Sequence, residues 1–159
     1  MRAFISYSHK DHSHLAPFLT HLKPVAAEYG IELWCDEVLE TGDDWKQEIL
    51  DHIDRADLFF PLVTANFIAS DFIVDEELPP MLKRSGAGGA LLLPVIVRRC
   101  SWAILFGSIQ ATPRGPRGLL PIADWKPHNN GYHCAAEQIG SAIRKHLAST
   151  ALTLAGSTP

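Results

Sequence analysis

Short, continuous runs of apolar residues recur along the chain, and most are followed by a longer segment with apolar residues at helical spacing. The runs are rich in aliphatic and aromatic residues, which predicts buried strands. These predicted strands cover residues 3–7, 31–35, 58–63, 91–97 and 119–122. The periodic segments predict helices over residues 14–29, 45–56, 72–84 and 133–147.

Prolines lie inside two of the predicted helices. Pro24 is in the first helix, and we expect a kink or break there because proline cannot donate the backbone hydrogen bond. Pro79 and Pro80 are expected to distort the middle of the third helix for the same reason. Gly30 follows the first helix, where a glycine commonly forms the cap.

The alternation of strands and helices predicts an α/β fold. The strands are apolar throughout rather than at every second position, which favours a parallel sheet covered by helices on both faces. Such sheets bind ligands beyond the carboxyl ends of their strands. We therefore expect the site among the segments that follow the first three strands, at residues 8–11, 36–45 and 64–77.

Length and composition restrict the class of protein. The 159 residues suit one domain, and 47% hydrophobic residues are enough to bury a core. A net charge of −4 gives no basic surface for nucleic acid, and no apolar stretch is long enough to cross a membrane. Three widely spaced cysteines suit a reducing compartment, so we expect a cytoplasmic protein without disulfides or bound metal.

The last residues differ from the rest of the chain. Residues 149–159 contain no charged side chain and resemble a linker. We therefore assign residues 1–148 to one domain and residues 149–159 to a linker-like tail that leads to a further domain.

Common catalytic motifs are absent. The sequence contains neither of the glycine-rich phosphate loops, GxGxxG and GxxxxGK, and no GxSxG nucleophile motif. Strand three ends in Thr64 rather than the aspartate that a receiver domain requires. Two polar clusters are interpreted as a helix-capping loop and a solvated loop, because their spacing matches no metal motif. They are His9, Asp11, His12 and His14, and Asp36, Glu37 and Glu40.

The stretch SDFIVDEEL at residues 70–78 places three consecutive carboxylates after the third strand. Acidic residues at a helix start interact favourably with the helix dipole, by about 0.3–1 kcal/mol each. Three adjacent like charges also repel, however. One of Asp75, Glu76 and Glu77 facing the predicted cleft would indicate a site tuned for chemistry.

Several segments together resemble a bacterial Toll/interleukin-receptor (TIR) domain. They are FISYSHKD, ELWCDEVLETGDDWKQEI, DLFFPLVTANFIASDFIVDEEL, LLLPVIVRRCSW and LFGSIQATP, which occur in the order and spacing of the family. The resemblance covers residues 1–147 and implies a flavodoxin-like open parallel five-stranded sheet with helices on both faces. The family contains adaptors, which assemble with like domains, and enzymes that cleave NAD⁺ between nicotinamide and ribose.

The resemblance implies one catalytic glutamate. The pattern places it five residues after the aromatic Phe72, at Glu77, and Glu76 takes the role if the gap is one residue shorter. One carboxylate is chemically sufficient, because nicotinamide leaves NAD⁺ as a neutral base and needs no general acid, unlike the leaving group of an ordinary glycoside. The carboxylate then stabilises the cationic ribose, forms an ester with it or holds its hydroxyls.

The resemblance also implies how the substrate is bound. NAD⁺ is expected as substrate, with no further cofactor, and self-association through the 36–45 loop is expected to complete the cleft. The expected substrate-binding residues are Tyr7, Ser8, His9, Lys10, Asp36, Trp45 and Phe72. Trp45 is also interpreted as a core anchor of its helix.

Three functions follow from these patterns. The first is an NAD⁺ hydrolase or cyclase that acts as an effector in bacterial defence and is switched on by self-assembly. The alternative is a non-catalytic interaction module. A deoxyribose transferase shares the sheet and a glutamate nucleophile, but the continuation LPVIVRRCSW argues against it.

Overall fold

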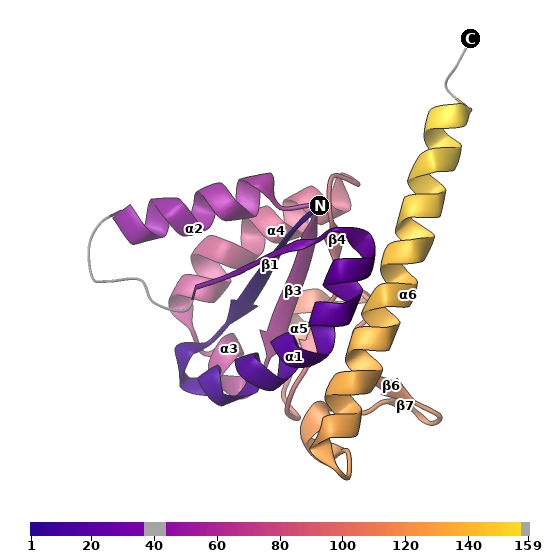
Figure 1. The fold of residues 1–159 in the computed structure, drawn as a ribbon. Helices are drawn as coiled ribbons and strands as arrows, with labels where there is room; N and C mark the ends of the chain where they lie inside the picture. The colour runs from indigo at the N-terminus through magenta and orange to yellow at the C-terminus, as the bar shows by residue number, and fades with distance from the viewer. Residues whose placement is uncertain (37–43, 157–159) are drawn as a thin grey trace.

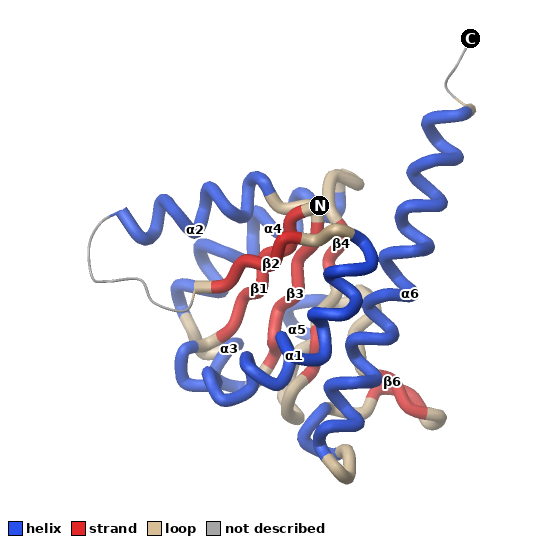
Figure 2. Tube along the Cα trace, in the orientation of Figure 1, coloured by secondary structure: helices blue, strands red, loops and turns tan. Residues whose placement is uncertain are grey.

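A five-stranded parallel sheet forms the centre of the computed structural model, which describes residues 1–36 and 44–156. The strands run in the order β2–β1–β3–β4 (Figure 2), and β5 pairs with β3 beyond the end of β4. Their bounds are β1 Arg2–Tyr7, β2 Glu32–Cys35, β3 Leu58–Val63, β4 Leu91–Leu92 and β5 Val95–Ile96. The predicted fold class, an open parallel sheet within an α/β fold, is confirmed.

Helices cover both faces of the sheet (Figure 1). Alternate residues of one strand point to opposite faces, so Ile5 of β1 packs with α1 and α6 while Phe4 packs with α2 and α4. The helices and helical turns are η1 His9–Asp11, α1 His12–Tyr29, α2 Asp44–Arg55, α3 Ala65–Ile68, η2 Ile73–Glu77, α4 Leu78–Gly86, α5 Ala103–Phe106, η3 Ile122–Asp124 and α6 His128–Ala155.

Prolines split the strand that was predicted over residues 91–97. It consists of β4 and β5, with Pro94 between them. Continuing the register of both pairs with β3 brings Pro94 opposite Pro61. Because neither proline can donate a hydrogen bond, the ladder between these strands is interrupted at this level.

The strand predicted at residues 119–122 was wrong. Leu119 belongs to β7 Gly118–Leu119, which pairs antiparallel with β6 Arg114–Gly115 in a separate hairpin. Gly118 turns this hairpin with a φ of 111°, a conformation that favours glycine. Pro121 then precedes η3, so the apolar run never reaches the main sheet.

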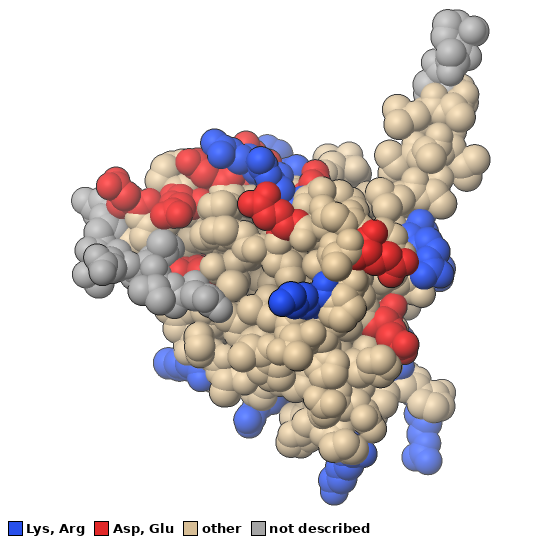
Figure 3. All heavy atoms as spheres, viewed as in Figure 1, with Lys and Arg blue, Asp and Glu red and all other residues tan. Residues whose placement is uncertain are grey.

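Two helix predictions also need correction. Helix α1 continues through Pro24 without a break, and because Pro24 and Thr20 are both exposed, the Thr20 carbonyl that lacks an intrahelical partner is open to water. Helix α6 continues beyond residue 147 to Ala155, through most of the predicted linker-like tail, and its end projects from the body of the molecule (Figure 1). This projecting end carries no Lys, Arg, Asp or Glu side chain after Lys145 (Figure 3). No helix in the described ranges has both the length and the hydropathy needed to span a membrane.

Candidate active site

A cleft of about 370 Å³ lies at the carboxyl ends of β1, β2 and β3, where the topology predicts a ligand site. All eight residues predicted for the site contribute to its lining. They are Tyr7, Ser8, His9, Lys10, Asp36, Trp45, Phe72 and Glu77. The parallel sheet brings them together because the segments that follow its strands all begin at the same edge, where the carboxyl ends of the strands lie. The cleft volume is within the range of about 300–1,000 Å³ that is usual for small-molecule sites.

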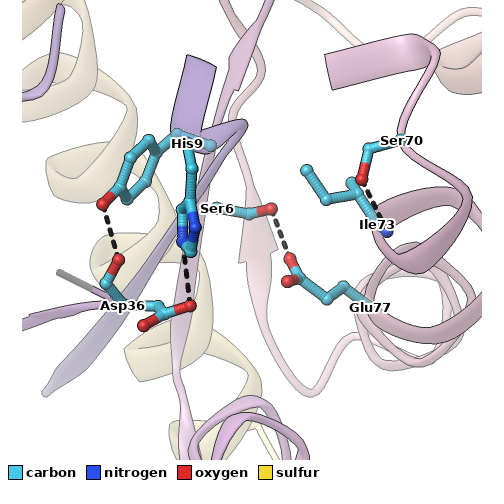
Figure 4. Close-up of polar contacts among 7 residues, drawn as sticks. Ser6, His9, Asp36, Ser70, Ile73 and Glu77 are labelled. Atoms are coloured by element: carbon cyan, nitrogen blue, oxygen red, sulfur yellow. Dashed lines mark hydrogen bonds and ion pairs between the residues drawn. The ribbon is translucent and has the colours of Figure 1, made fainter. Parts of the chain in front are cut away.

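Glu77 is the buried carboxylate of this cleft. It is 6% exposed, and its Oε2 accepts a hydrogen bond of 2.5 Å from the hydroxyl of Ser6, which is 2% exposed (Figure 4). Ser6 is on β1 and Glu77 is at the end of η2, so the bond joins the central sheet to the segment after β3. The position of this carboxylate is therefore fixed by two elements that are 71 residues apart in the chain.

Burial changes the acidity of Glu77. Removal from water raises its pKa from 4.5 to about 7, the hydrogen bond from Ser6 opposes this rise, and the nearby Asp36 carboxylate adds to it. The group therefore ionises near neutral pH. Carboxylates with a pKa in this range occur frequently at catalytic sites.

A π-helical turn determines which glutamate enters the cleft. The N–H of Leu78 donates to the carbonyl of Ile73, five residues earlier rather than four. Pro79 and Pro80 follow at once and cannot donate to the carbonyls of the preceding turn, which favours this wider turn. Phe72 and Glu77 consequently line the same cleft although they are five positions apart.

The neighbouring acidic side chains lie elsewhere. Glu76 is half-buried on the outer side of the turn, where it accepts a hydrogen bond of 2.7 Å from Lys46 of α2. Asp75 is exposed. Neither contributes to the lining of the cleft, so the three consecutive carboxylates have three different environments.

The opposite wall of the cleft carries a second polar group. Nε2 of His9 lies 3.0 Å from the Asp36 carboxylate oxygen Oδ2. The hydroxyl of Tyr7 donates a hydrogen bond of 2.5 Å to the backbone carbonyl of Asp36. Among the residues that the structure describes, the other carboxylate oxygen of Asp36 is buried and has no hydrogen-bond partner. Figure 4 shows His9 and Asp36 on one side of Ser6 and Glu77 on the other.

Trp45 and Phe72 form the apolar part of the wall. Their ring centroids are 4.7 Å apart at an interplanar angle of 53°. Both also pack against the core on the α2 and α4 side of the sheet. Trp45 thus anchors its helix and lines the cleft at the same time, the two roles that its sequence position allowed.

Asp11 connects two of the loops that surround the cleft. It is 6% exposed and accepts hydrogen bonds from Thr64 at 2.5 Å and from Asn66 at 3.0 Å. Thr64 also caps α3 by accepting from the N–H of Phe67. The segment after β1 is thereby held against the segment after β3.

The polar cluster at residues 9–14 separates into different environments. His9 faces the cleft and Asp11 is buried beside Thr64, whereas His14 bonds Tyr132 of α6 through Nδ1 at 2.7 Å. Burial lowers the pKa of His14, and the charge of Arg98 lowers it further. Within residues 1–36 and 44–156, no group of three or more His, Cys, Asp or Glu side chains is arranged to hold a metal ion.

Sequence reasoning missed Ser6 and Asn66, which also line the cleft. Ser6 belongs to no catalytic motif, and the available signal was its position near the carboxyl end of β1. Asn66 gave no signal, because a polar residue in a short loop is common. The 36–45 loop proposed for self-association lies largely outside the described residues, which end at Asp36 and resume at Asp44.

Comparison with known proteins agrees with this architecture. Residues 3–117 match the sequence model of the TIR domain. The chain is also similar to the uncharacterized protein y4lF of Sinorhizobium fredii, with 32% identity over 161 residues. That alignment covers 98% of this chain and 49% of y4lF, so the chain spans about half the length of this relative. The chain belongs to the TIR domain family.

Proposed function

We propose that this TIR domain cleaves NAD⁺ between nicotinamide and ribose, by hydrolysis or cyclisation, with Glu77 as the catalytic carboxylate. The observation that carries the proposal is a single buried glutamate within a cleft at the carboxyl edge of the sheet. The family includes enzymes of this kind, but membership alone does not distinguish them from adaptors. The environment of Glu77 favours the enzyme.

The chemistry of the leaving group explains why one carboxylate is sufficient. Nicotinamide is attached to ribose as a cationic pyridinium and takes the bonding electrons with it as a neutral base. The ribose that remains carries positive charge at C1′ and its ring oxygen. An ionised Glu77, itself buried, stabilises this charge more strongly than water does. A positively charged substrate also favours the ionised form of Glu77.

The remaining lining supplies contacts for the rest of the dinucleotide. Lys10 and Ser8, after β1, are suited to phosphate and ribose oxygens. Trp45 and Phe72 offer aromatic surface against a planar ring. We further propose that the protein acts as an effector in bacterial defence in the cytoplasm, and that self-association through the 36–45 loop activates it.

The proposal is tested by incubating the purified protein at high concentration with NAD⁺ and measuring free nicotinamide. Glu77→Gln is expected to reduce release by about 10²–10³-fold, the usual effect of removing a group that stabilises charge in the transition state. Glu76→Gln is the matched control, because it changes the adjacent residue in the same way and leaves the cleft intact.

Each outcome distinguishes the candidate functions. Loss of release with the Glu76 change alone would assign catalysis to the other glutamate. No release from the wild-type protein, even when assembly is forced by tethering copies to a surface, would favour the interaction module. Release that increases more steeply than protein concentration would support activation by self-association.

A further inference from the structure

The pair formed by His9 and Asp36 has the features of an oriented base. Asp36 has a side chain that is only 14% exposed, and its Oδ2 lies 3.0 Å from Nε2 of His9. The hydroxyl of Tyr7 holds the Asp36 backbone at 2.5 Å, and the Tyr7 ring lies 5.6 Å from the His9 ring. The imidazole is therefore held by its partner although its own side chain is 67% exposed.

This arrangement determines which ring nitrogen is basic. A carboxylate accepts hydrogen bonds, so Nε2 of a neutral His9 carries the proton and donates it to Asp36. The lone pair is then on Nδ1. A carboxylate that holds an imidazole in one tautomer is the arrangement by which histidine serves as a general base in hydrolytic enzymes.

Hydrolysis of NAD⁺, unlike cyclisation, releases a proton at its second step, and a base that takes this proton accelerates the attack of water. Nicotinamide departs without needing a proton, but the water that attacks C1′ must lose one. The balanced reaction converts NAD⁺ and water into ADP-ribose, nicotinamide and one proton. Glu77 lies on the other side of Ser6 from His9 and Asp36, and its Oε2 accepts the Ser6 hydrogen bond (Figure 4).

We propose that His9 is a second catalytic residue, which takes the proton from the attacking water at Nδ1, with Asp36 as its positioning residue. The inference rests on the proposed cleavage of NAD⁺ and assigns its second step to hydrolysis. The new bond joins the water oxygen to C1′, the C1′–nitrogen bond has broken toward nicotinamide, and the proton passes from the exposed imidazole to solvent. Asp36 stabilises the imidazolium that forms in between.

A competing nucleophile separates this role from substrate binding. A pyridine such as 3-acetylpyridine attacks C1′ through its ring nitrogen, which has no proton to lose. Exchange of nicotinamide for this pyridine therefore needs Glu77 but no general base. Hydrolysis also uses the base, so the ratio of ADP-ribose to the exchanged dinucleotide reports on base catalysis of the water attack.

The experiment incubates concentrated protein with NAD⁺ and 3-acetylpyridine and measures both products by chromatography. His9→Ala, and His9→Gln, which keeps a donor for Asp36 but is not a base, are expected to reduce ADP-ribose formation by about 100-fold, a usual effect of general base catalysis. Exchange should remain close to the wild-type rate. Asp36→Asn is expected to lower the same ratio.

His12→Ala is the matched control, because the ring of His12 lies 6.2 Å from Tyr7 but His12 does not line the cleft. It should change neither product. Equal loss of hydrolysis and exchange in the His9 variants would overturn the proposal in favour of a binding role. Unchanged hydrolysis, or a wild-type product that is entirely cyclic, would also overturn it. Wild-type protein that yields neither product, even when copies are tethered to a surface, would refute NAD⁺ cleavage itself, and this inference with it.

Discussion

The two sides of the η2 turn place the same functional group in opposite surroundings. On the cleft side, Glu77 is buried, is bonded to Ser6 and has a pKa of about 7. On the outer side, Glu76 is half-exposed and paired with Lys46. The two residues are adjacent in the chain and chemically identical. The difference shows that burial and neighbouring groups, rather than residue type, determine which carboxylate has a raised pKa.

The largest expected effect is on stability. Glu77 holds its proton more tightly in the folded than in the unfolded protein, so the free energy of unfolding falls as pH rises from about 4.5 to about 7. Above that range Glu77 is ionised in both states, and its burial as a carboxylate lowers the free energy of unfolding by about 3 kcal/mol. Glu77→Gln removes this cost and should stabilise the protein by up to about that amount at pH 8, but not at pH 4.

Urea unfolding at the two pH values measures this effect, with Glu76→Gln as the control. The control should change the free energy of unfolding by less than about 1 kcal/mol at either pH, because its ion pair is exposed. Equal effects of the two substitutions would contradict the difference between the two sides of the turn.

The second prediction concerns the pH dependence of cleavage. If ionised Glu77 is required, kcat/KM should rise about tenfold between pH 6 and pH 8, with a midpoint near 7. Nicotinamide release at low NAD⁺ concentration measures this dependence. A rate that is already constant from pH 5 upward would mean that the reactive carboxylate has an ordinary pKa, as expected of an exposed glutamate.

Removal of the Ser6 hydroxyl should move that midpoint. The hydrogen bond from Ser6 lowers the pKa of Glu77, so Ser6→Ala should raise the pKa further and shift the midpoint to higher pH. Activity at pH 7 should fall severalfold while activity at high pH recovers. Ser70→Ala changes another serine of the cleft, which contacts Ile73 rather than Glu77, and should leave the midpoint in place.

Deletion of Asp75 should have a smaller effect, although it shortens the turn that carries Glu77. The bond from Leu78 to Ile73 then spans four residues, which is the α-helical spacing. The turn should tighten to an α-helix and keep Glu77 in the cleft, so most of the nicotinamide release should persist. Combining the deletion with Glu77→Gln or with Glu76→Gln identifies the active carboxylate. If release from the deletion variant is lost with Glu76→Gln instead, the π-helical turn does not determine which glutamate lies in the cleft.

The smallest effect is expected at Lys46. Its side chain and that of Glu76 are 44% and 39% exposed, so Lys46→Ala should lower the free energy of unfolding by less than about 1 kcal/mol. Thermal unfolding and nicotinamide release should both remain near the wild-type values. A large loss of release would mean that the outer side of the turn takes part in catalysis.

Much of the fold and the location of the cleft could be predicted from the pattern of residues. Continuous apolar runs such as 58–63 indicated strands buried on both faces, and parallel topology then indicated one edge for the site. Errors arose where local pattern competes with tertiary contacts. The run at 119–122 has strand composition, but the hairpin turned by Gly118 and the proline at 121 direct it elsewhere.

The sequence by itself determined which segments of the chain meet at the cleft, because periodicity sets the strands and parallel topology places their carboxyl ends at one edge of the sheet. It left the choice between Glu76 and Glu77 to a resemblance. Only the tertiary structure shows that Glu77, and not Glu76, lies in the cleft, through the π-helical turn and the contact with Ser6. The pairing of His9 with Asp36 was likewise visible only in three dimensions. Acidity and orientation depend on distances and burial among residues far apart in the chain, and a linear pattern does not contain these quantities.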